Sequence, residues 1–149
     1  MENSKYEKEK EDKLNTGKFF SVEEENSIKQ HMRFPSKLIH TFEETPYEWE
    51  SLLFVSDSGN NWVLVIDEKT LECIDVIGSG TWGDIDGSFS ECSLYHPQGL
   101  ALYWDEENKQ CSLIICDVKN HKLKLANLTD KSIVTLAGTG KRGVDPEGG

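Results

Sequence analysis

Two glycine-rich segments are the first places in this sequence where residue spacing could support chemistry. The pattern Gly-x-Gly-x-x-Gly occurs at residues 78–83 and again at 138–143. In nucleotide-binding proteins such glycines let the backbone approach a pyrophosphate at the N-terminus of a helix. No helical periodicity follows either copy, so we favour tight connections whose backbone needs positive φ over a nucleotide site.

Cysteine and histidine side chains could bind a metal or act as nucleophile and base. Zinc requires close pairs of ligands, whereas Cys111 and Cys116 have four residues between them and fall on opposite faces of one strand. We expect Cys73, Cys92, Cys111 and Cys116 to be structural thiols. The four histidines, His31, His40, His96 and His121, show no spacing of an acid, a base and a nucleophile. The sequence therefore predicts no catalytic residue, no cofactor and no metal.

Matching Asp and Asn residues stand where two predicted strands end. Asp57 and Asp117 are expected to accept hydrogen bonds from backbone N–H groups of the turn that follows each of them. Asn60 and Asn120 are expected to adopt the left-handed conformation, and His121 to close the second turn. Binding of a cation by the two acids is the alternative. If they hold turns, replacing either acid with Ala should cost about 1 kcal/mol of stability.

Eight short β-like runs position these turns, in two sets of four. The runs are 37–42, 52–56, 62–66 and 72–77, then 100–104, 112–116, 123–126 and 133–137. Residues 54–61 align with 114–121, and 78–83 with 138–143, both at an offset of 60. Such a repeat of four strands is typical of a β-propeller blade. The sequence predicts an all-β fold with blades at 34–94 and 95–149, and a long loop at 78–95.

The second set also carries recognisable motifs. His-Pro-Gln-Gly-Leu-Ala at 96–101, Cys-Asp-x-x-Asn-His at 116–121 and Val-Thr-Leu-Ala-Gly-Thr-Gly at 134–140 resemble the NHL repeat. The resemblance covers about residues 34–149, and it implies the first two blades of a six-bladed NHL propeller that follows a thioredoxin-like domain. This sequence has no Cys-x-x-Cys and matches two blades only. We therefore expect it to be a fragment.

Charge and composition limit the partners. Residues 1–33 read as a charged tail or linker, since the first thirty hold eight acidic residues and six lysines; a short helix that docks on another molecule is the alternative. The whole chain has 27 acidic and 16 basic residues and a net charge of -11, which argues against nucleic acid. No apolar run is long enough for a membrane span. Few cysteines and no secretory leader predict a cytoplasmic protein.

The function that we predict is a non-catalytic protein-interaction scaffold, because propellers bind partners through loops. Connections at one end of the strands form the candidate partner surface: Trp82, Asp84, Asp86, Lys119, His121, Lys141 and Arg142. The partner protein is not identified by the sequence. A metal-assisted propeller hydrolase or lyase, and a redox protein whose thioredoxin-like domain lies outside this chain, are the alternatives.

Two blades alone should leave apolar faces uncovered, because a repeat unit cannot cover its own apolar face. The residues expected on these faces are Leu38, Val65, Ile74, Leu113, Leu123 and Ile133. Further blades or self-association are therefore expected.

Overall fold

A computed structural model describes residues 32–41 and 51–143. Its elements are β1 (Pro35–His40), β2 (Leu52–Asp57), the 3-10 turn η1 (Ser58–Asn60), β3 (Trp62–Asp67), β4 (Cys73–Ile77), β5 (Gly87–Ser88), β6 (Pro97–Asp105), β7 (Gln110–Asp117), η2 (Val118–Asn120), β8 (Lys122–Asn127) and β9 (Ser132–Ala137). The all-β prediction is confirmed, and each of the eight predicted runs overlaps a strand. The described ranges contain no helix long and apolar enough to cross a membrane.

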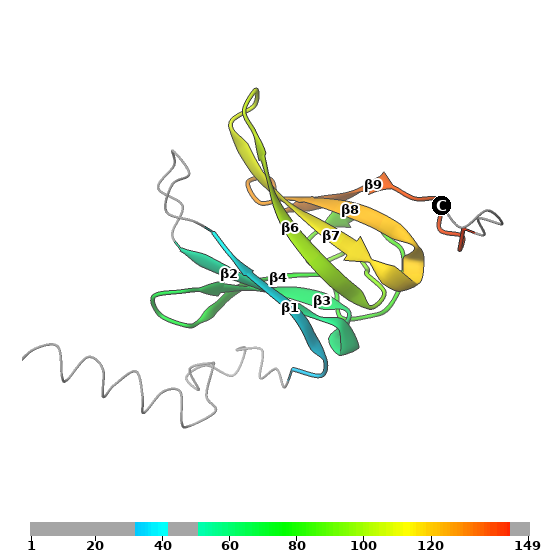
Figure 1. Cartoon of the computed structure of the whole chain (residues 1–149). Helices are drawn as coiled ribbons and strands as arrows, with labels where there is room; N and C mark the ends of the chain where they lie inside the picture. Colours follow the sequence, from blue (N-terminus) through cyan, green and yellow to red (C-terminus); the bar gives the residue numbers. More distant parts are fainter. Residues whose placement is uncertain (1–31, 42–50, 144–149) are drawn as a thin grey trace, which may run out of the picture.

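The strands form two antiparallel sheets that follow the sequence repeat (Figure 1). Blade 1 has the order β1-β2-β3-β4, and blade 2 has the order β5-β9-β8-β7-β6. Pro35 pairs with Asp57, and Pro97 pairs with Asp117 in the same way. Each of these two ladders has an irregularity directly after its proline. The internal repeat is therefore preserved in the register of the strands.

The main hydrophobic core lies between the two blades. Phe54 and Val63 from blade 1 meet Leu113 and Ile115 from blade 2, and all four are fully buried. Strand alternation explains this arrangement, because every second residue of β2, β3 and β7 points toward the other blade. Burial of such side chains contributes about 1.5–3 kcal/mol each, so packing of one blade on the other stabilises both.

The segment 78–95, predicted to be a loop, contributes to this core. It contains β5, which pairs with β9, and a bridge between Ile85 and Ser93. Its residues Cys92 and Leu94 are fully buried in the core between the blades. The paired parts of the segment, the two residues of β5 and one isolated bridge, are too short to show a strand period. Its apolar side chains nevertheless complete the packing between the blades. Of the predicted tail, the described residues 32–33 also belong to blade 1, while residues 1–31 lie outside the described ranges.

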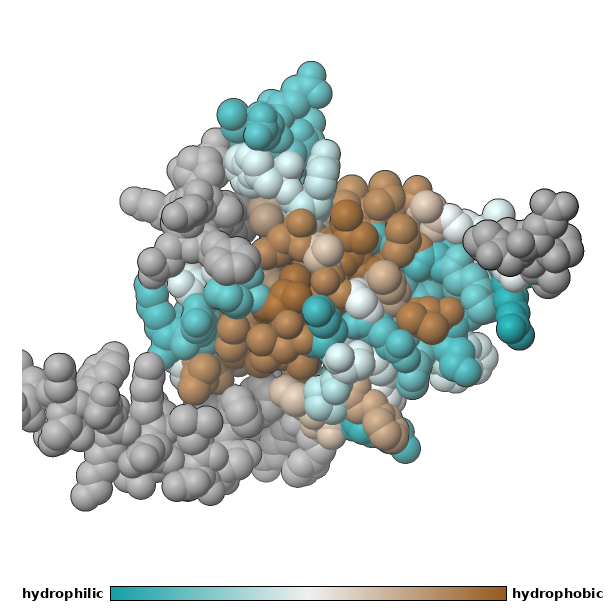
Figure 2. Space-filling view, viewed as in Figure 1, coloured by the Kyte–Doolittle hydropathy of each residue, from teal (hydrophilic) through white to brown (hydrophobic). Residues whose placement is uncertain are grey.

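The prediction of the uncovered faces is wrong for three of its six residues. Val65, Leu113 and Ile133 lie in the core between the blades, because they face the neighbouring blade. The remaining three residues of that set, Leu38, Ile74 and Leu123, are exposed. Tyr103 and Val134 are also exposed, on the face of blade 2 that points away from blade 1. Figure 2 shows hydrophobic residues spread across the middle of the molecule, without a polar layer over them.

We expect the purified chain to associate through the outer face of blade 2, because monomers seldom expose a contiguous apolar sheet face. Light scattering should give a mass above that of one chain. Val134→Lys on β9 should lower that mass, whereas Thr129→Lys in an exposed hairpin of the same blade should not. A compact monomer of the unmodified chain would contradict the expectation.

Candidate functional site

Asp57, at the end of β2, holds the segment that enters blade 1. Its side chain is fully buried. Oδ1 accepts the backbone N–H groups of Arg33 and Phe34, each at 2.9 Å. Oδ2 accepts Asn60 Nδ2 at 2.6 Å and Trp62 Nε1 at 3.3 Å. The carboxylate therefore joins the incoming chain, the turn and β3.

Asp117 repeats this arrangement in blade 2. Its Oδ1 accepts the N–H of Tyr95 at 2.7 Å, and its Oδ2 accepts Asn120 Nδ2 at 2.7 Å. Asn120 Nδ2 also donates to the Gly83 carbonyl at 2.6 Å. Burial raises the pKa of Asp117, while the hydrogen bonds from Asn120 and the N–H of Tyr95 lower it, and the pKa stays above its usual value. The residue fastens the connection between the blades to the second turn.

The predicted roles of the turn residues need correction. Neither Asp57 nor Asp117 makes a side-chain cap bond to its own 3-10 turn, because their carboxylates reach backbone N–H groups of remote segments. The left-handed residues are Asn61 (φ 59°) and His121 (φ 51°). Asn60 and Asn120 were predicted there, but each is the last residue of a three-residue turn and uses its amide on the aspartate. His121 closes its turn through the backbone, as expected.

The glycine-rich segments are tight connections with positive φ, as predicted. Gly78 has φ +115° and Gly138 has φ +100°. A Cβ at Gly78 would lie 2.9 Å from the Asn61 carbonyl oxygen, and one at Gly138 would lie 2.3 Å from that of His121. Only glycine allows each connection to pass so close to the preceding turn.

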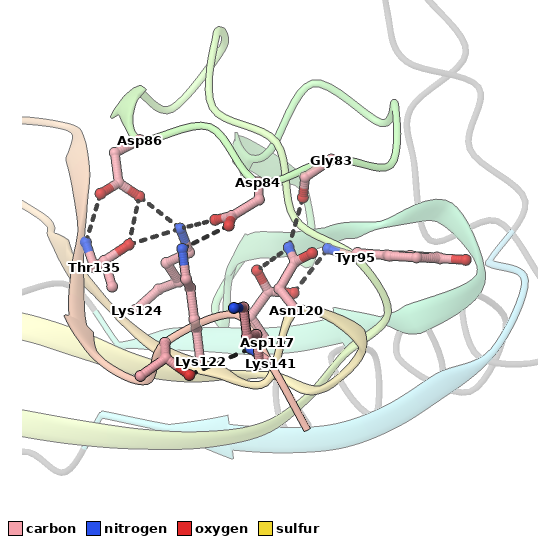
Figure 3. Close-up of polar contacts among 11 residues, drawn as sticks. Gly83, Asp84, Asp86, Tyr95, Asp117, Asn120, Lys122, Lys124, Thr135 and Lys141 are labelled. Atoms are coloured by element: carbon pink, nitrogen blue, oxygen red, sulfur yellow. Dashed lines mark hydrogen bonds and ion pairs between the residues drawn. The ribbon is translucent and has the colours of Figure 1, made fainter. Parts of the chain in front are cut away.

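A buried lysine lies next to these turns, at a position that no sequence motif marks. Lys124, on β8, is 1% exposed. Its Nζ lies 2.7 Å from Asp84 Oδ1, 2.6 Å from Asp86 Oδ1 and 2.9 Å from Thr135 Oγ1 (Figure 3). Lys122 Nζ binds the second oxygen of Asp84 at 2.5 Å. We call these five residues the lysine–aspartate network. In blade 1 the position equivalent to Lys124 is occupied by Leu64, so the available signal was a lysine where the first repeat has an apolar residue.

The network keeps its acids ionised. Hydrogen bonds from Lys122 and Lys124 lower the pKa of Asp84. Burial raises the pKa of Asp86, but bonds from Lys124 and Thr135 outweigh it, so the pKa is lowered. Burial lowers the pKa of Lys124, and its two carboxylate partners reverse that effect and raise it. Asp84 and Asp86, placed on the candidate partner surface by the sequence, are thus engaged within the chain.

The remaining residues of that surface are all exposed: Trp82, Lys119, His121, Lys141 and Arg142. The rings of Trp82, which is 66% exposed, and Tyr95 have centroids 5.3 Å apart. Lys119 donates its backbone N–H to the Tyr95 carbonyl. Lys141 and Arg142 follow Gly140, where a Cβ would lie within 4 Å of atoms of Asn120 and Lys122. We call Trp82, Tyr95, Lys119, Lys141 and Arg142 the turn-end surface. Within residues 32–41 and 51–143 its three cations make no ion pair.

The cysteines are not arranged for thiol chemistry. All four are free, and burial raises the pKa of Cys73, Cys92 and Cys111, that of Cys92 to about 11. Such thiols stay protonated at neutral pH and are weak nucleophiles. In the part of the chain that the structure describes, no three His, Cys, Asp or Glu side chains converge as metal ligands.

Comparisons with known proteins agree with the repeat. No family model matches the chain. It is 34% identical over 119 residues to "Protein SUPPRESSOR OF QUENCHING 1, chloroplastic" of Arabidopsis thaliana, covering 79% of this chain and 10% of that protein. It is 32% identical over 115 residues to NHL repeat-containing protein 2 of Gallus gallus, covering 77% and 15%, and 32% identical over 102 residues to the Homo sapiens protein, covering 68% and 14%. The chain thus spans only 10–15% of the length of these relatives.

A solved structure supports the fold alone. An auxiliary nutrient binding protein from Bacteroides thetaiotaomicron matches with a TM-score of 0.50 and 15% identity, over 58% of this chain and 23% of that one. It is a β-propeller-type protein.

Two repeated antiparallel sheets, of four and five strands, pack face to face and are joined by the glycine-bearing segment 78–95; they are consecutive blades of a β-propeller. The chain belongs to the NHL-repeat family. The particular relative that carries the repeat in its name is NHL repeat-containing protein 2.

Proposed function

We propose that this NHL-repeat domain is a non-catalytic protein-interaction module and that the turn-end surface contacts the partner. The observation that carries the proposal is the exposed Trp82 ring, packed on Tyr95 beside three cations without acidic partners in the described ranges. Trp, Tyr and Arg are the residues that most often dominate binding energy at protein interfaces. Exposing an indole to water serves no purpose in the packing of the blade itself.

Preorganisation also supports this role. Asn120 Nδ2 binds both the Asp117 carboxylate and the Gly83 carbonyl, so the loops that carry Lys119 and Trp82 are tied together. Asp117 holds the N–H of Tyr95 in place as well. Loops fixed in this way lose little conformational entropy when a partner binds.

The enzymatic alternatives have less support in the described residues. A redox role would need an accessible thiol of low pKa, whereas burial raises the pKa of three of the four cysteines. A metal-assisted hydrolase would need acids and histidines from several blades to converge on a metal, and no three such side chains converge in the described residues. Four free thiols are compatible with a reducing compartment, and we propose the cytoplasm.

Site-specific photo-crosslinking tests the proposal. A photoreactive phenylalanine replaces Trp82 in one sample of the full chain and replaces Glu106 in another. Glu106 is exposed in the β6–β7 hairpin, at the opposite end of the strands. We expect discrete protein adducts from position 82 and none of these from position 106.

Equal adducts from both positions, or none from position 82, would contradict the turn-end surface as the binding site. Thiol-reductase turnover, or hydrolysis that depends on a metal bound to the purified chain, would contradict the non-catalytic role.

A further inference from the structure

The charge balance at the turn-end surface opposes that of the whole chain. The chain carries a net charge of -11. At this end, however, Asp84 and Asp86 are neutralised by Lys122 and Lys124. Of the acids that the structure describes at this end, the two others, Asp57 and Asp117, are fully buried.

Among the described residues, the exposed charges at this end that lack an ion-pair partner are cationic. Lys119, Lys141 and Arg142 are exposed, and the described residues supply no acidic partner to any of them. A surface with one sign of charge attracts and orients ligands of the opposite sign. Arg142 can in addition bind a carboxylate through two parallel hydrogen bonds.

An apolar anchor lies beside these cations. Trp82 and Tyr95 have tilted rings with an interplanar angle of 36°, and Ile85 nearby in the sequence is 56% exposed. An exposed aromatic pair of this kind can bury the side chain of a partner residue, and aromatic contacts contribute binding free energy beyond that of the buried area. The cations then favour acidic residues in the partner segment that contacts this aromatic pair, and the aromatic contact supplies affinity.

We infer, as an extension of the proposed function, that the turn-end surface binds an acidic segment of a partner protein that contains one aromatic or large aliphatic residue. The acidic side chains contact Lys119, Lys141 and Arg142, and the apolar residue packs on Trp82. Single-stranded nucleic acid also combines negative charge with stacking. The acidic peptide is favoured, since three cations can match a few carboxylates, whereas a nucleic-acid backbone carries a charge on every nucleotide and meets a chain of net charge -11.

Peptide selection on the full chain tests the inference. A random peptide library displayed on phage is selected against the immobilised protein, and an enriched peptide is then titrated by fluorescence anisotropy. We expect enrichment of Asp and Glu around one aromatic residue or Leu, and an affinity that falls as salt is raised. Lys141→Glu/Arg142→Glu should weaken binding by roughly tenfold or more, and Trp82→Ala by a similar factor.

Lys69→Glu/Lys109→Glu is the matched control. It makes the same change of charge in two exposed hairpins at the other end of the strands, and binding should not change. An oligouridine RNA is titrated in parallel. Enriched peptides that are basic or uncharged, absence of enrichment, or tighter binding of the RNA would each overturn the inference.

Failure of this inference can be told apart from failure of the proposed function. If crosslinking at position 82 captures a partner while the selection fails, the interaction role stands and the acidic ligand is wrong. If both experiments fail, both proposals are wrong.

Discussion

Removing the charges of Asp84 and Asp86 together, as Asp84→Asn/Asp86→Asn, is expected to destabilise the fold by about 3 kcal/mol. The reason is the burial of Lys124, whose side chain is 1% exposed and whose ammonium has both carboxylates as its anionic partners. The double variant keeps the shape of the side chains but leaves a buried cation without a counter-charge. Urea unfolding of the full chain, followed by far-UV circular dichroism, measures the change.

Removing the lysine instead of the two acids should cost less stability. In Lys124→Met the two acids remain 35% and 39% exposed, and Asp84 keeps Lys122, so water and one lysine still stabilise their charges. We expect about 1 kcal/mol. Adding Lys124→Met to the double aspartate variant should restore most of the lost stability, because the unpaired cation is then gone. Equal costs for both changes, with no recovery in the triple variant, would show that the charges are not coupled.

The same network predicts the response to acid. The pKa values of Asp84 and Asp86 are lower in the folded chain than in the unfolded one. The unfolded chain therefore binds more protons in acid, and the stability that the network contributes is lost as the pH falls below about 4. Asp117, whose pKa burial raises, acts in the opposite direction. Stability of Lys124→Met should depend less on pH in this range than that of the unmodified chain.

Replacing Asp57 with Ala is expected to cost about 3 kcal/mol, well above the 1 kcal/mol expected of a turn residue. The carboxylate is fully buried and accepts four hydrogen bonds. Without it, the N–H groups of Arg33 and Phe34 lose their acceptor, and the segment before β1 is released. Urea unfolding gives the free energy, and hydrogen exchange at these two amides should accelerate.

Asp67→Ala is the matched control for this loss. Asp67 accepts the N–H groups of Lys69 and Thr70 within its own exposed hairpin, so its removal affects one local turn only. Its effect on the urea midpoint should be clearly smaller than that of Asp57→Ala. Similar midpoints for the two variants would mean that the hydrogen bonds of Asp57 to Arg33 and Phe34 contribute no stability beyond that of a local turn.

Local sequence patterns were sufficient for the fold. Alternating apolar residues specify strands because side chains of a strand point to opposite faces in turn. The repeat at an offset of 60 specifies two equivalent sheets, and the glycines at 78 and 138 mark connections that pass close to a turn. Each of these signals depends on neighbours along the chain. The same patterns could not tell which face of a blade meets its neighbour, so Val65 and Leu113 were placed on the wrong side.

Tertiary structure decided what the polar residues do. The sequence by itself singled out Asp57, Asp117, Asp84 and Asp86, but each of them has at least one partner 22 to 49 residues away along the chain. Those partners are set by how the segments before β1 and β6 fold back on the blade that each of them enters, and hydrogen bonds between such remote segments leave no local pattern. Stacking of the blades also buried Lys124, whose ammonium neutralises two acids that stay partly exposed. The surplus of cationic charge at the turn end is therefore a product of the packing, because ion pairs between segments remote in the sequence decide which exposed charges stay unpaired.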